Sequence, residues 1–315
     1  MLSVIIPAYN EEKLISKTAR VVIELLTEEK IPHEILFVND GSKDHTWDEI
    51  EKVTKQYEQV RGICFSRNFG KESAMFAGLE YCKGDCCVLM DCDLQHPPEK
   101  IIEMYRLWEE GYEIIEAVKA DRGEESVLHA CAANLFYKII SNIIKIDMSS
   151  ASDFKLLDRK AITVLLNIHE KNVFFRALSS WIGFKTTQVS FEVQKREEGE
   201  SKWSTWSLVK YALTNITSFS TAPMQIVTFL GVIMMLATVI FGTVALYQKI
   251  IGIALEGFTT IILLQLFTGS IVMISLGIMG YYIAKIYDEV KGRPRYIVSE
   301  VSENKNNEKI NSQIF

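Results

Sequence analysis

Two aspartates separated by one residue, Asp91 and Asp93, directly follow the apolar run CCVLM. In an extended segment the side-chain period of two directs both carboxylates to the same side. Carboxylate oxygens are ligands that Mg²⁺ and Mn²⁺ accept, usually together with phosphate oxygens and water. The pair therefore predicts a divalent-metal site that binds a diphosphate, although an isolated D-x-D is also common in solvated loops.

Three further polar clusters follow other apolar runs, and their residues have the chemistry to bind a nucleotide. Asp40, in NDGSKD, could accept hydrogen bonds from a nucleobase or a ribose hydroxyl. Tyr9 and Glu11, in PAYNEE, could flank a base, and Arg67 and Lys71, in SRNFGK, could pair with phosphates. Each cluster also has a structural alternative, namely an Asx-turn or helix cap at Asp40, turn chemistry in PAYNEE and a solvated charged surface in SRNFGK.

Apolar runs and helical patterns alternate along the first part of the chain and would position these clusters. Strands are predicted at 2–6, 34–38, 62–66 and 86–91, and helices at 11–30, 46–57, 70–82, 99–110, 126–144 and 158–168. The alternation predicts an α/β fold with a mostly parallel sheet and right-handed crossovers. The polar clusters follow the strands, where ligands bind in sheets of this kind.

The last third of the chain predicts attachment to a membrane. Residues 226–247 carry no charge, and a helix of this length covers about 33 Å, enough for a bilayer core. A second uncharged run extends over 258–284. Residues 203–220 have the pattern of an amphipathic helix with two tryptophans, which suits a membrane interface or, alternatively, a core-packing helix. The two uncharged runs predict two spans, and because lysines and arginines follow the second run, the positive-inside rule predicts that the catalytic domain and both termini lie in the cytoplasm.

Composition argues against other classes of protein. The formal net charge of −6 does not suit a nucleic-acid-binding protein, which needs a basic surface. The six cysteines lack the paired C-x-x-C spacing with histidines that zinc sites show. Cys86 and Cys87 lie in a strand-like run, where cysteine acts as a small buried hydrophobe. We therefore expect a reduced, cytosolic domain without a disulfide framework.

Six motifs together resemble the family 2 inverting glycosyltransferases of the polyprenyl-phosphate type. They are, in order, PAYNEE, FVNDGSKDHT, SRNFGKESA, MDCDLQHPPE, ASDFKLLDR and REEGESKW, followed by two predicted spans. The family includes dolichyl-phosphate mannose synthases and bactoprenol-phosphate glucosyltransferases, and the bacterial two-span branch is the closer likeness. The match runs from Ser3 to about Arg295. It implies a GT-A-like catalytic domain at 1–200, an amphipathic juxtamembrane region at 201–225, a two-helix transmembrane anchor at 226–284 and a partly disordered cytoplasmic tail at 285–315.

The resemblance also implies roles for individual residues. The nucleotide pocket would comprise Pro7, Ala8, Tyr9, Glu11, Asp40, Lys71 and Asp91. The metal ligands would be Asp91 and Asp93, and the catalytic residues Asp93 and Asp153. The acceptor phosphate would be bound by Arg122, Arg196, Ser201 and Lys202. Two positions depart from the family pattern: Asn39-Asp40 replaces a double aspartate, and Ala117-Val118-Lys119 replaces a G-x-R motif, so Lys119 lacks the bidentate fork of arginine.

The implied reaction transfers a sugar, from UDP-glucose or UDP-N-acetylglucosamine, to polyprenyl phosphate with inversion, and it uses Mg²⁺ or Mn²⁺. A phosphate monoester has a second pKa of about 6 and is already an anionic nucleophile near pH 7. We therefore expect Asp153 to orient the acceptor or the sugar hydroxyls more than to remove a proton. A homo-oligomer and a separate flippase are conceivable partners. The alternatives are a GDP-mannose-dependent mannosyltransferase, a polysaccharide synthase, and a non-catalytic membrane scaffold that binds nucleotide sugars.

Overall fold

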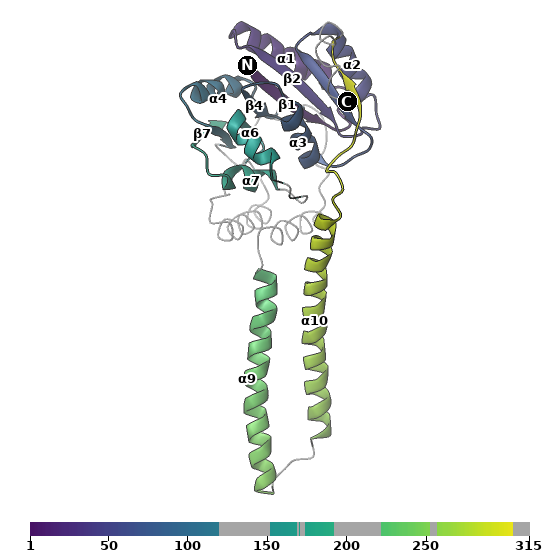
Figure 1. Cartoon of the computed structure of the whole chain (residues 1–315), viewed down its shortest axis with the longest axis vertical. Helices are drawn as coiled ribbons and strands as arrows, with labels where there is room; N and C mark the ends of the chain where they lie inside the picture. The colour runs from purple at the N-terminus through teal and green to yellow at the C-terminus, as the bar shows by residue number, and fades with distance from the viewer. Residues whose placement is uncertain (120–151, 169, 171–173, 192–221, 253–256, 305–315) are drawn as a thin grey trace. The chain divides into compact units, whose positions relative to one another are not determined.

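The computed structural model of the chain describes residues 1–119, 152–168, 170, 174–191, 222–252 and 257–304 (Figure 1). The chain divides into two compact units, one comprising Met1–Leu208 with Pro294–Phe315 and the other Val209–Arg293. Several predictions lie outside the described residues. They concern the helices at 126–144 and 203–220 and the four residues expected to bind the acceptor phosphate, Arg122, Arg196, Ser201 and Lys202.

The described part of the first unit contains an eight-stranded sheet with the order β7-β5-β6-β4-β1-β2-β3-β8. The strands are β1 (Leu2–Ala8), β2 (His33–Asn39), β3 (Val60–Phe65), β4 (Cys86–Leu89), β5 (Ile114–Lys119), β6 (Lys155–Asp158), β7 (Thr186–Phe191) and β8 (Val298–Ser302). Strands β1 to β4 run parallel, as does the pair β5 and β7, whereas β6 and β8 are antiparallel to their neighbours. The predicted α/β fold with a mostly parallel sheet is therefore confirmed.

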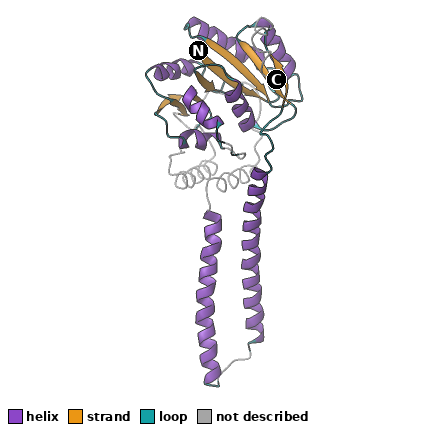
Figure 2. Cartoon of the chain, in the orientation of Figure 1, coloured by secondary structure: helices purple, strands orange, loops and turns teal. Residues whose placement is uncertain are grey.

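Helices cover both faces of this sheet (Figure 2). They are α1 (Ile15–Glu28), α2 (Thr46–Gln56), α3 (Lys71–Tyr81), α4 (Glu99–Glu109), α6 (Arg159–Leu166) and α7 (Phe175–Trp181). Helices α1, α2 and α4 pack on the face that includes Val4 and Phe37, and α3, α6 and α7 pack on the face that includes Ile5 and Leu89. Burial on both faces explains why the central strands are continuous apolar runs without alternation. Cys86 and Cys87 are fully buried in β4, as predicted.

The edge strand β8 comes from the segment that follows the apolar runs. It pairs antiparallel with β3, and Val301 lies opposite Ile63. Trp47 donates its ring N–H to Glu300, and Arg61 pairs with Glu303 at 2.6 Å. This segment lies in the predicted partly disordered tail, 285–315, for which no strand was predicted.

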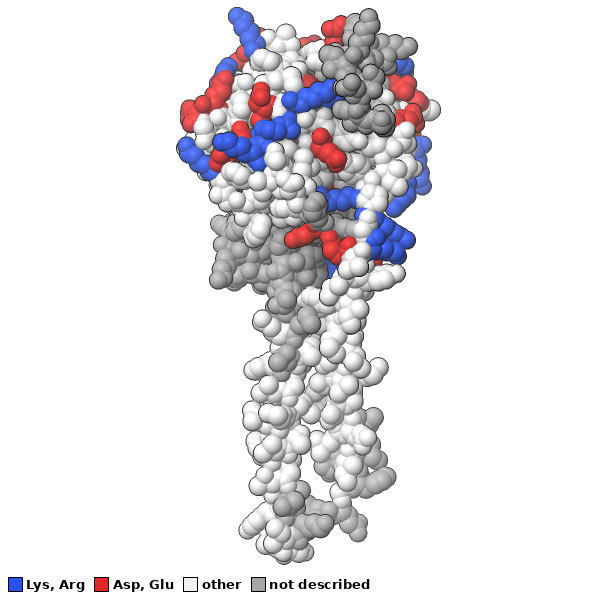
Figure 3. Space-filling model, in the orientation of Figure 1, with Lys and Arg blue, Asp and Glu red and all other residues white. Residues whose placement is uncertain are grey.

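The second unit contains the helices α9 (Ala222–Ile250) and α10 (Phe258–Val290). Of the described residues, one stretch, Phe267–Val290 in α10, is long and apolar enough to cross a membrane, and α9 has a shorter apolar stretch, Phe229–Val244. Large apolar side chains are exposed on both helices, for example Phe241 and Met273. The described surface of the two helices in Figure 3 is almost uncharged. One membrane-spanning helix is thus supported, and the second span stays a prediction.

Candidate active site

The loops after β1 and β2 are joined at the carboxyl end of the sheet. The Asn10 backbone N–H donates to Ser42, and the Asn10 side chain accepts from the Lys43 N–H, both at 2.9 Å. The Glu11 N–H donates to Thr46 at 2.9 Å. These bonds bring together the predicted nucleotide residues of both loops, which are Pro7, Ala8, Tyr9, Glu11 and Asp40. Tyr9 is exposed there, whereas Ala8 is buried and its carbonyl accepts the Asp40 N–H at 2.9 Å.

Asp40 is buried and holds the next loop, residues 66–70. Its two carboxylate oxygens accept the backbone N–H groups of Phe69 at 2.6 Å and Gly70 at 2.9 Å. Burial raises the pKa of Asp40, and the two N–H groups oppose this shift. Gly41, with φ +61°, lies so close that a Cβ there would be 2.3 Å from the Arg67 carbonyl carbon. Asp40 therefore anchors a distant loop, a structural role that differs from the predicted Asx-turn or helix cap, and its nucleotide contact stays a prediction.

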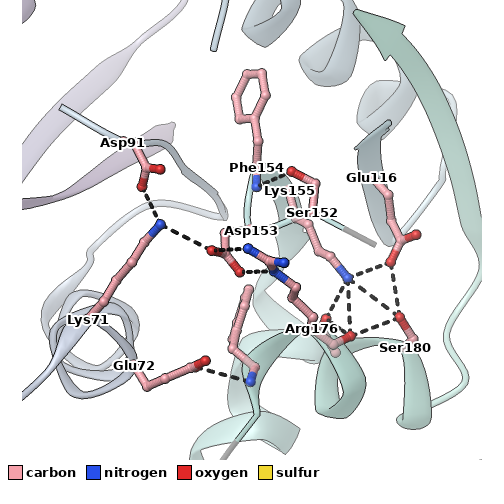
Figure 4. A network of polar contacts seen from close by, with 12 residues as sticks. Lys71, Glu72, Asp91, Glu116, Ser152, Asp153, Phe154, Lys155, Arg176 and Ser180 are labelled. Atoms are coloured by element: carbon pink, nitrogen blue, oxygen red, sulfur yellow. Dashed lines mark hydrogen bonds and ion pairs between the residues drawn. The ribbon is translucent and has the colours of Figure 1, made fainter. Parts of the chain in front are cut away.

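A chain of alternating charges crosses the carboxyl end of the sheet (Figure 4). The Lys71 ammonium, at the start of α3, lies 2.6 Å from Asp91 Oδ1 and 3.1 Å from Asp153 Oδ2. Arg176, on α7, donates two hydrogen bonds to Asp153, at 2.7 and 2.9 Å. The predicted metal residue Asp91 and the predicted catalytic residue Asp153 are therefore bridged by one cation.

These contacts determine the charge states of the cluster. Burial opposes ionisation of Asp153, but Arg176 and then Lys71 lower the pKa of its carboxyl well below the usual range. Burial likewise opposes ionisation of Asp91, and Lys71 lowers its pKa. The two carboxylates in turn raise the pKa of Lys71 against the effect of burial. Asp153 is thus a charged, doubly paired carboxylate and a poor base, because a proton would have to displace two cations.

Asp93 lies in a tight turn that follows Asp91. Its Oδ1 accepts the Gln95 N–H at 3.1 Å, and Leu94 between them has φ +54°, a left-handed conformation that is costly for a branched side chain. Next along the chain, His96 is buried, stacks on Phe154 with ring centroids 4.7 Å apart, and accepts the Asp91 N–H at 3.3 Å. Burial lowers the pKa of His96, consistent with a neutral ring that accepts this bond. A strained turn with packed surroundings is typical of a functional site.

A buried polar group holds α7 against the sheet. Lys155, fully buried on β6, pairs with Glu116 on β5 at 2.5 Å and donates to Ser179 on α7 at 2.7 Å. Ser180, also on α7, donates to the same Glu116 oxygen at 3.1 Å (Figure 4). Burial lowers the pKa of Lys155, against the effect of Glu116. Because α7 also carries Arg176, this group fixes the guanidinium that binds Asp153.

Glu72 lies beside the same cluster and has an unusual charge state. Its Oε2 accepts the Phe175 N–H, at the start of α7, at 3.1 Å. Burial and the negative charge of Asp153 raise the pKa of Glu72 to about 8. A protonated Glu72 links α3 to α7 without adding a further negative charge next to Asp153.

The donor set at the end of β4 fits a hard divalent cation. Asp91 already binds a cationic group, the Lys71 ammonium, and Asp91 and Asp93 both offer carboxylate oxygens. Among the described residues no group of three or more His, Cys, Asp or Glu side chains is arranged to hold a metal ion. Two aspartates are nevertheless sufficient when phosphate oxygens and water complete the coordination.

Sequence reasoning missed three members of this network, Arg176, Glu72 and Lys155. One signal was available for Lys155, because a lysine flanked by Phe154 and Leu156 in an apolar strand requires a buried partner. Arg176 and Glu72 stand in no recognisable spacing with Asp153. They meet it only through the packing of α3 and α7.

The described fold is an α/β domain with a mostly parallel sheet and with acidic side chains at its carboxyl edge. Residues 3–164 match Glycosyl transferase family 2, and the chain belongs to that family. The resemblance noted in the sequence is thereby confirmed, and the chain is a glycosyltransferase enzyme.

Relatives resemble the chain over nearly its whole length. A prophage bactoprenol glucosyl transferase homolog of Escherichia coli is 37% identical, and the match covers 95% of this chain and 99% of that protein. The bactoprenol glucosyl transferase of Shigella phage SfX is 35% identical, over 94% and 98% of the two chains. A solved glucosyl-3-phosphoglycerate synthase from Mycobacterium tuberculosis, in complex with Mn²⁺ and UDP-glucose, is 17% identical with a TM-score of 0.47, over 70% of this chain and 79% of that one.

Proposed function

We propose that this enzyme transfers glucose from UDP-glucose to a polyprenyl phosphate, with inversion at the anomeric carbon. The observation that carries the proposal is the cation-bound carboxylate pair of Asp91 and Asp153, beside the two joined loops at the carboxyl end of the sheet. The relatives named bactoprenol glucosyl transferase support glucose as the sugar and a polyprenyl phosphate as the acceptor.

On the donor side, Asp91 and Asp93 would hold Mg²⁺ or Mn²⁺. When bound, a divalent ion stabilises the negative charge that develops on the departing nucleoside diphosphate. The predicted nucleotide contacts are Pro7, Ala8, Tyr9, Glu11 and Asp40, with Lys71 near the phosphates. Their two loops are joined by hydrogen bonds, so a nucleotide would meet a preorganised surface.

On the acceptor side, the phosphate needs little activation because it is already an anion near pH 7. Asp153 would orient the acceptor or the sugar hydroxyls, and its two bound cations make it a poor proton acceptor. Arg122, Arg196, Ser201 and Lys202 are proposed to bind the acceptor phosphate, where positive charge would offset repulsion by the carboxylates.

The acceptor is a lipid, so the reaction requires a membrane. Helix α10 would span it, and we propose a second span at 226–247, which places the catalytic domain at 1–200 and both termini in the cytoplasm. In this arrangement the region 201–225 would lie at the membrane interface, and 226–284 would anchor the enzyme.

The test is a donor screen with the full chain in membranes. Radiolabelled UDP-glucose, UDP-N-acetylglucosamine and GDP-mannose are each incubated with undecaprenyl phosphate and Mg²⁺, and the lipid is extracted with organic solvent. We expect label from UDP-glucose in a lipid that mild acid hydrolyses. Label in polymer would indicate a polysaccharide synthase, and label from GDP-mannose alone a mannosyltransferase.

A matched pair of variants ties the activity to the site. Asp91→Asn should abolish transfer while the protein stays folded and inserted. Asp48→Asn, at an exposed aspartate that pairs with His45, should have no effect. Near-normal turnover of the Asp91→Asn variant in Mg²⁺ would refute the metal assignment.

A further inference from the structure

The segment that follows α10 contacts the catalytic domain before it forms β8. The Tyr296 ring stacks on Phe65, with centroids 4.9 Å apart and an interplanar angle of 13°. The Tyr296 hydroxyl also hydrogen-bonds with Glu80 on α3. The Arg295 guanidinium lies 4.5 Å from the centroid of the Phe76 ring and donates to the Glu170 carbonyl at 2.7 Å. The segment is therefore attached to both β3 and α3.

A further contact of this segment reaches the loop 66–70, which connects β3 to α3. The Ser66 N–H donates to the Ile297 carbonyl at 3.0 Å. Phe65 contacts Phe69 edge to face, with centroids 5.8 Å apart, and the Arg67 guanidinium carbon lies 4.0 Å from the centroid of the Phe69 ring. One end of this loop thus rests on residues that are distant in sequence and that directly follow the membrane helix.

The same loop supplies the groups that fix the nucleotide side of the site. The N–H groups of Phe69 and Gly70 bind the two carboxylate oxygens of Asp40, and the next residue is Lys71, which binds Asp91. A shift of Phe69 would therefore alter the position of Asp40 and the start of α3 together.

We propose that Tyr296 is a positioning residue for the nucleotide site, which acts through Phe65 and Phe69 on Asp40. The inference rests on the proposed function, because it requires Asp40 to contact the nucleotide. It assigns the segment after the membrane helix a part in donor binding, in addition to its part in the sheet.

The test measures UDP affinity by calorimetry on the purified full chain in detergent, with Mg²⁺ present. Tyr296→Leu removes the ring stack, and we expect UDP to bind about two- to tenfold more weakly, the range expected for loss of one aromatic pair. Tyr296→Phe keeps the ring and loses the hydroxyl bond to Glu80, and its affinity should stay within about twofold of the wild type.

Glu303→Gln is the matched control, because it removes the negative charge that pairs with Arg61 at the other end of β8 and leaves the ring stack intact. Thermal unfolding of each variant shows whether the losses of stability are comparable. Wild-type UDP affinity in Tyr296→Leu overturns the inference, as does an equal loss in Glu303→Gln. Asp40→Asn should weaken UDP binding, and a wild-type chain that does not bind UDP at all refutes the proposed function itself.

Discussion

The Lys71 ammonium lies 2.6 Å from Asp91 Oδ1, so we expect it to compete with the divalent ion that Asp91 is proposed to bind. The side chains of Lys71 and Asp91 are 43% and 34% exposed, so solvent screens their attraction. A charge-assisted hydrogen bond in such a setting contributes roughly 1–2 kcal/mol. Replacement by a neutral residue of similar length, Lys71→Met, removes the competitor and should tighten Mn²⁺ binding by about 5- to 30-fold.

The assay is a titration of the full chain with Mn²⁺ in the absence of nucleotide, in which electron paramagnetic resonance quantifies the free ion. Lys71→Arg keeps the positive charge and should not tighten binding. Lys52→Met removes a lysine that pairs with Glu49 on an exposed helix surface, and it should leave Mn²⁺ affinity unchanged. Unchanged or weaker binding by Lys71→Met would show that the lysine organises Asp91 and does not compete for it. Asp91→Asn should lose Mn²⁺ binding, and that loss would show that the ion binds at Asp91 whatever the result for Lys71→Met.

Two further predictions concern stability. The pKa of Glu72 is raised from 4.5 to about 8 in the folded chain, so the folded chain binds this proton more tightly than the unfolded chain does. Its contribution to the free energy of unfolding is therefore complete below pH 4.5 and is lost as the pH rises to about 8. Glu72→Gln keeps an acceptor for the Phe175 N–H and should raise Tm relative to the wild type at pH 9 but not at pH 5, and a pH-independent difference would contradict the assigned pKa. Lys155→Met leaves Glu116 buried without its cation and should cost about 3–5 kcal/mol in denaturant unfolding. The double variant Lys155→Met/Glu116→Gln should lose less than Lys155→Met alone, and an additive loss would mean that the two side chains do not stabilise each other.

Local patterns were sufficient to predict strands β1 to β4 and the acids that follow β2 and β4, whereas strands β5 to β8 were not predicted. The run CCVLM is apolar because β4 is buried on both faces, and the chain must leave the sheet after it, so Asp91 and Asp93 fall at the carboxyl edge. The same logic located Asp40 after β2. These inferences need only the periodicity of a strand and the parallel order of neighbouring strands.

The partners of those residues could not be predicted in the same way, because they depend on contacts between distant segments. Lys71 and Asp153 are 82 residues apart, and Trp47 and Glu300 are 253 apart. The strand Val298–Ser302 has only a short alternating pattern and owes its place to pairing with β3. No rule of local spacing specifies such a partner, so this segment was indistinguishable from the polar tail that follows it.

Asp153 is bound by an arginine and Asp91 by a lysine, and this difference suits an enzyme in which Asp91 exchanges its cation for a metal ion while Asp153 keeps its own. Arg176 holds Asp153 through two parallel hydrogen bonds, and α7, which carries it, is fixed by buried Lys155, so this contact is rigid. Lys71 makes one contact to each of Asp91 and Asp153 from a long, partly exposed stem, so it can leave Asp91 and still remain paired with Asp153. An arginine at position 71 could bind Asp91 through two donors and would oppose that exchange. The fixed cation therefore lies at Asp153 and the exchangeable one at Asp91, the carboxylate that is proposed to bind a metal ion.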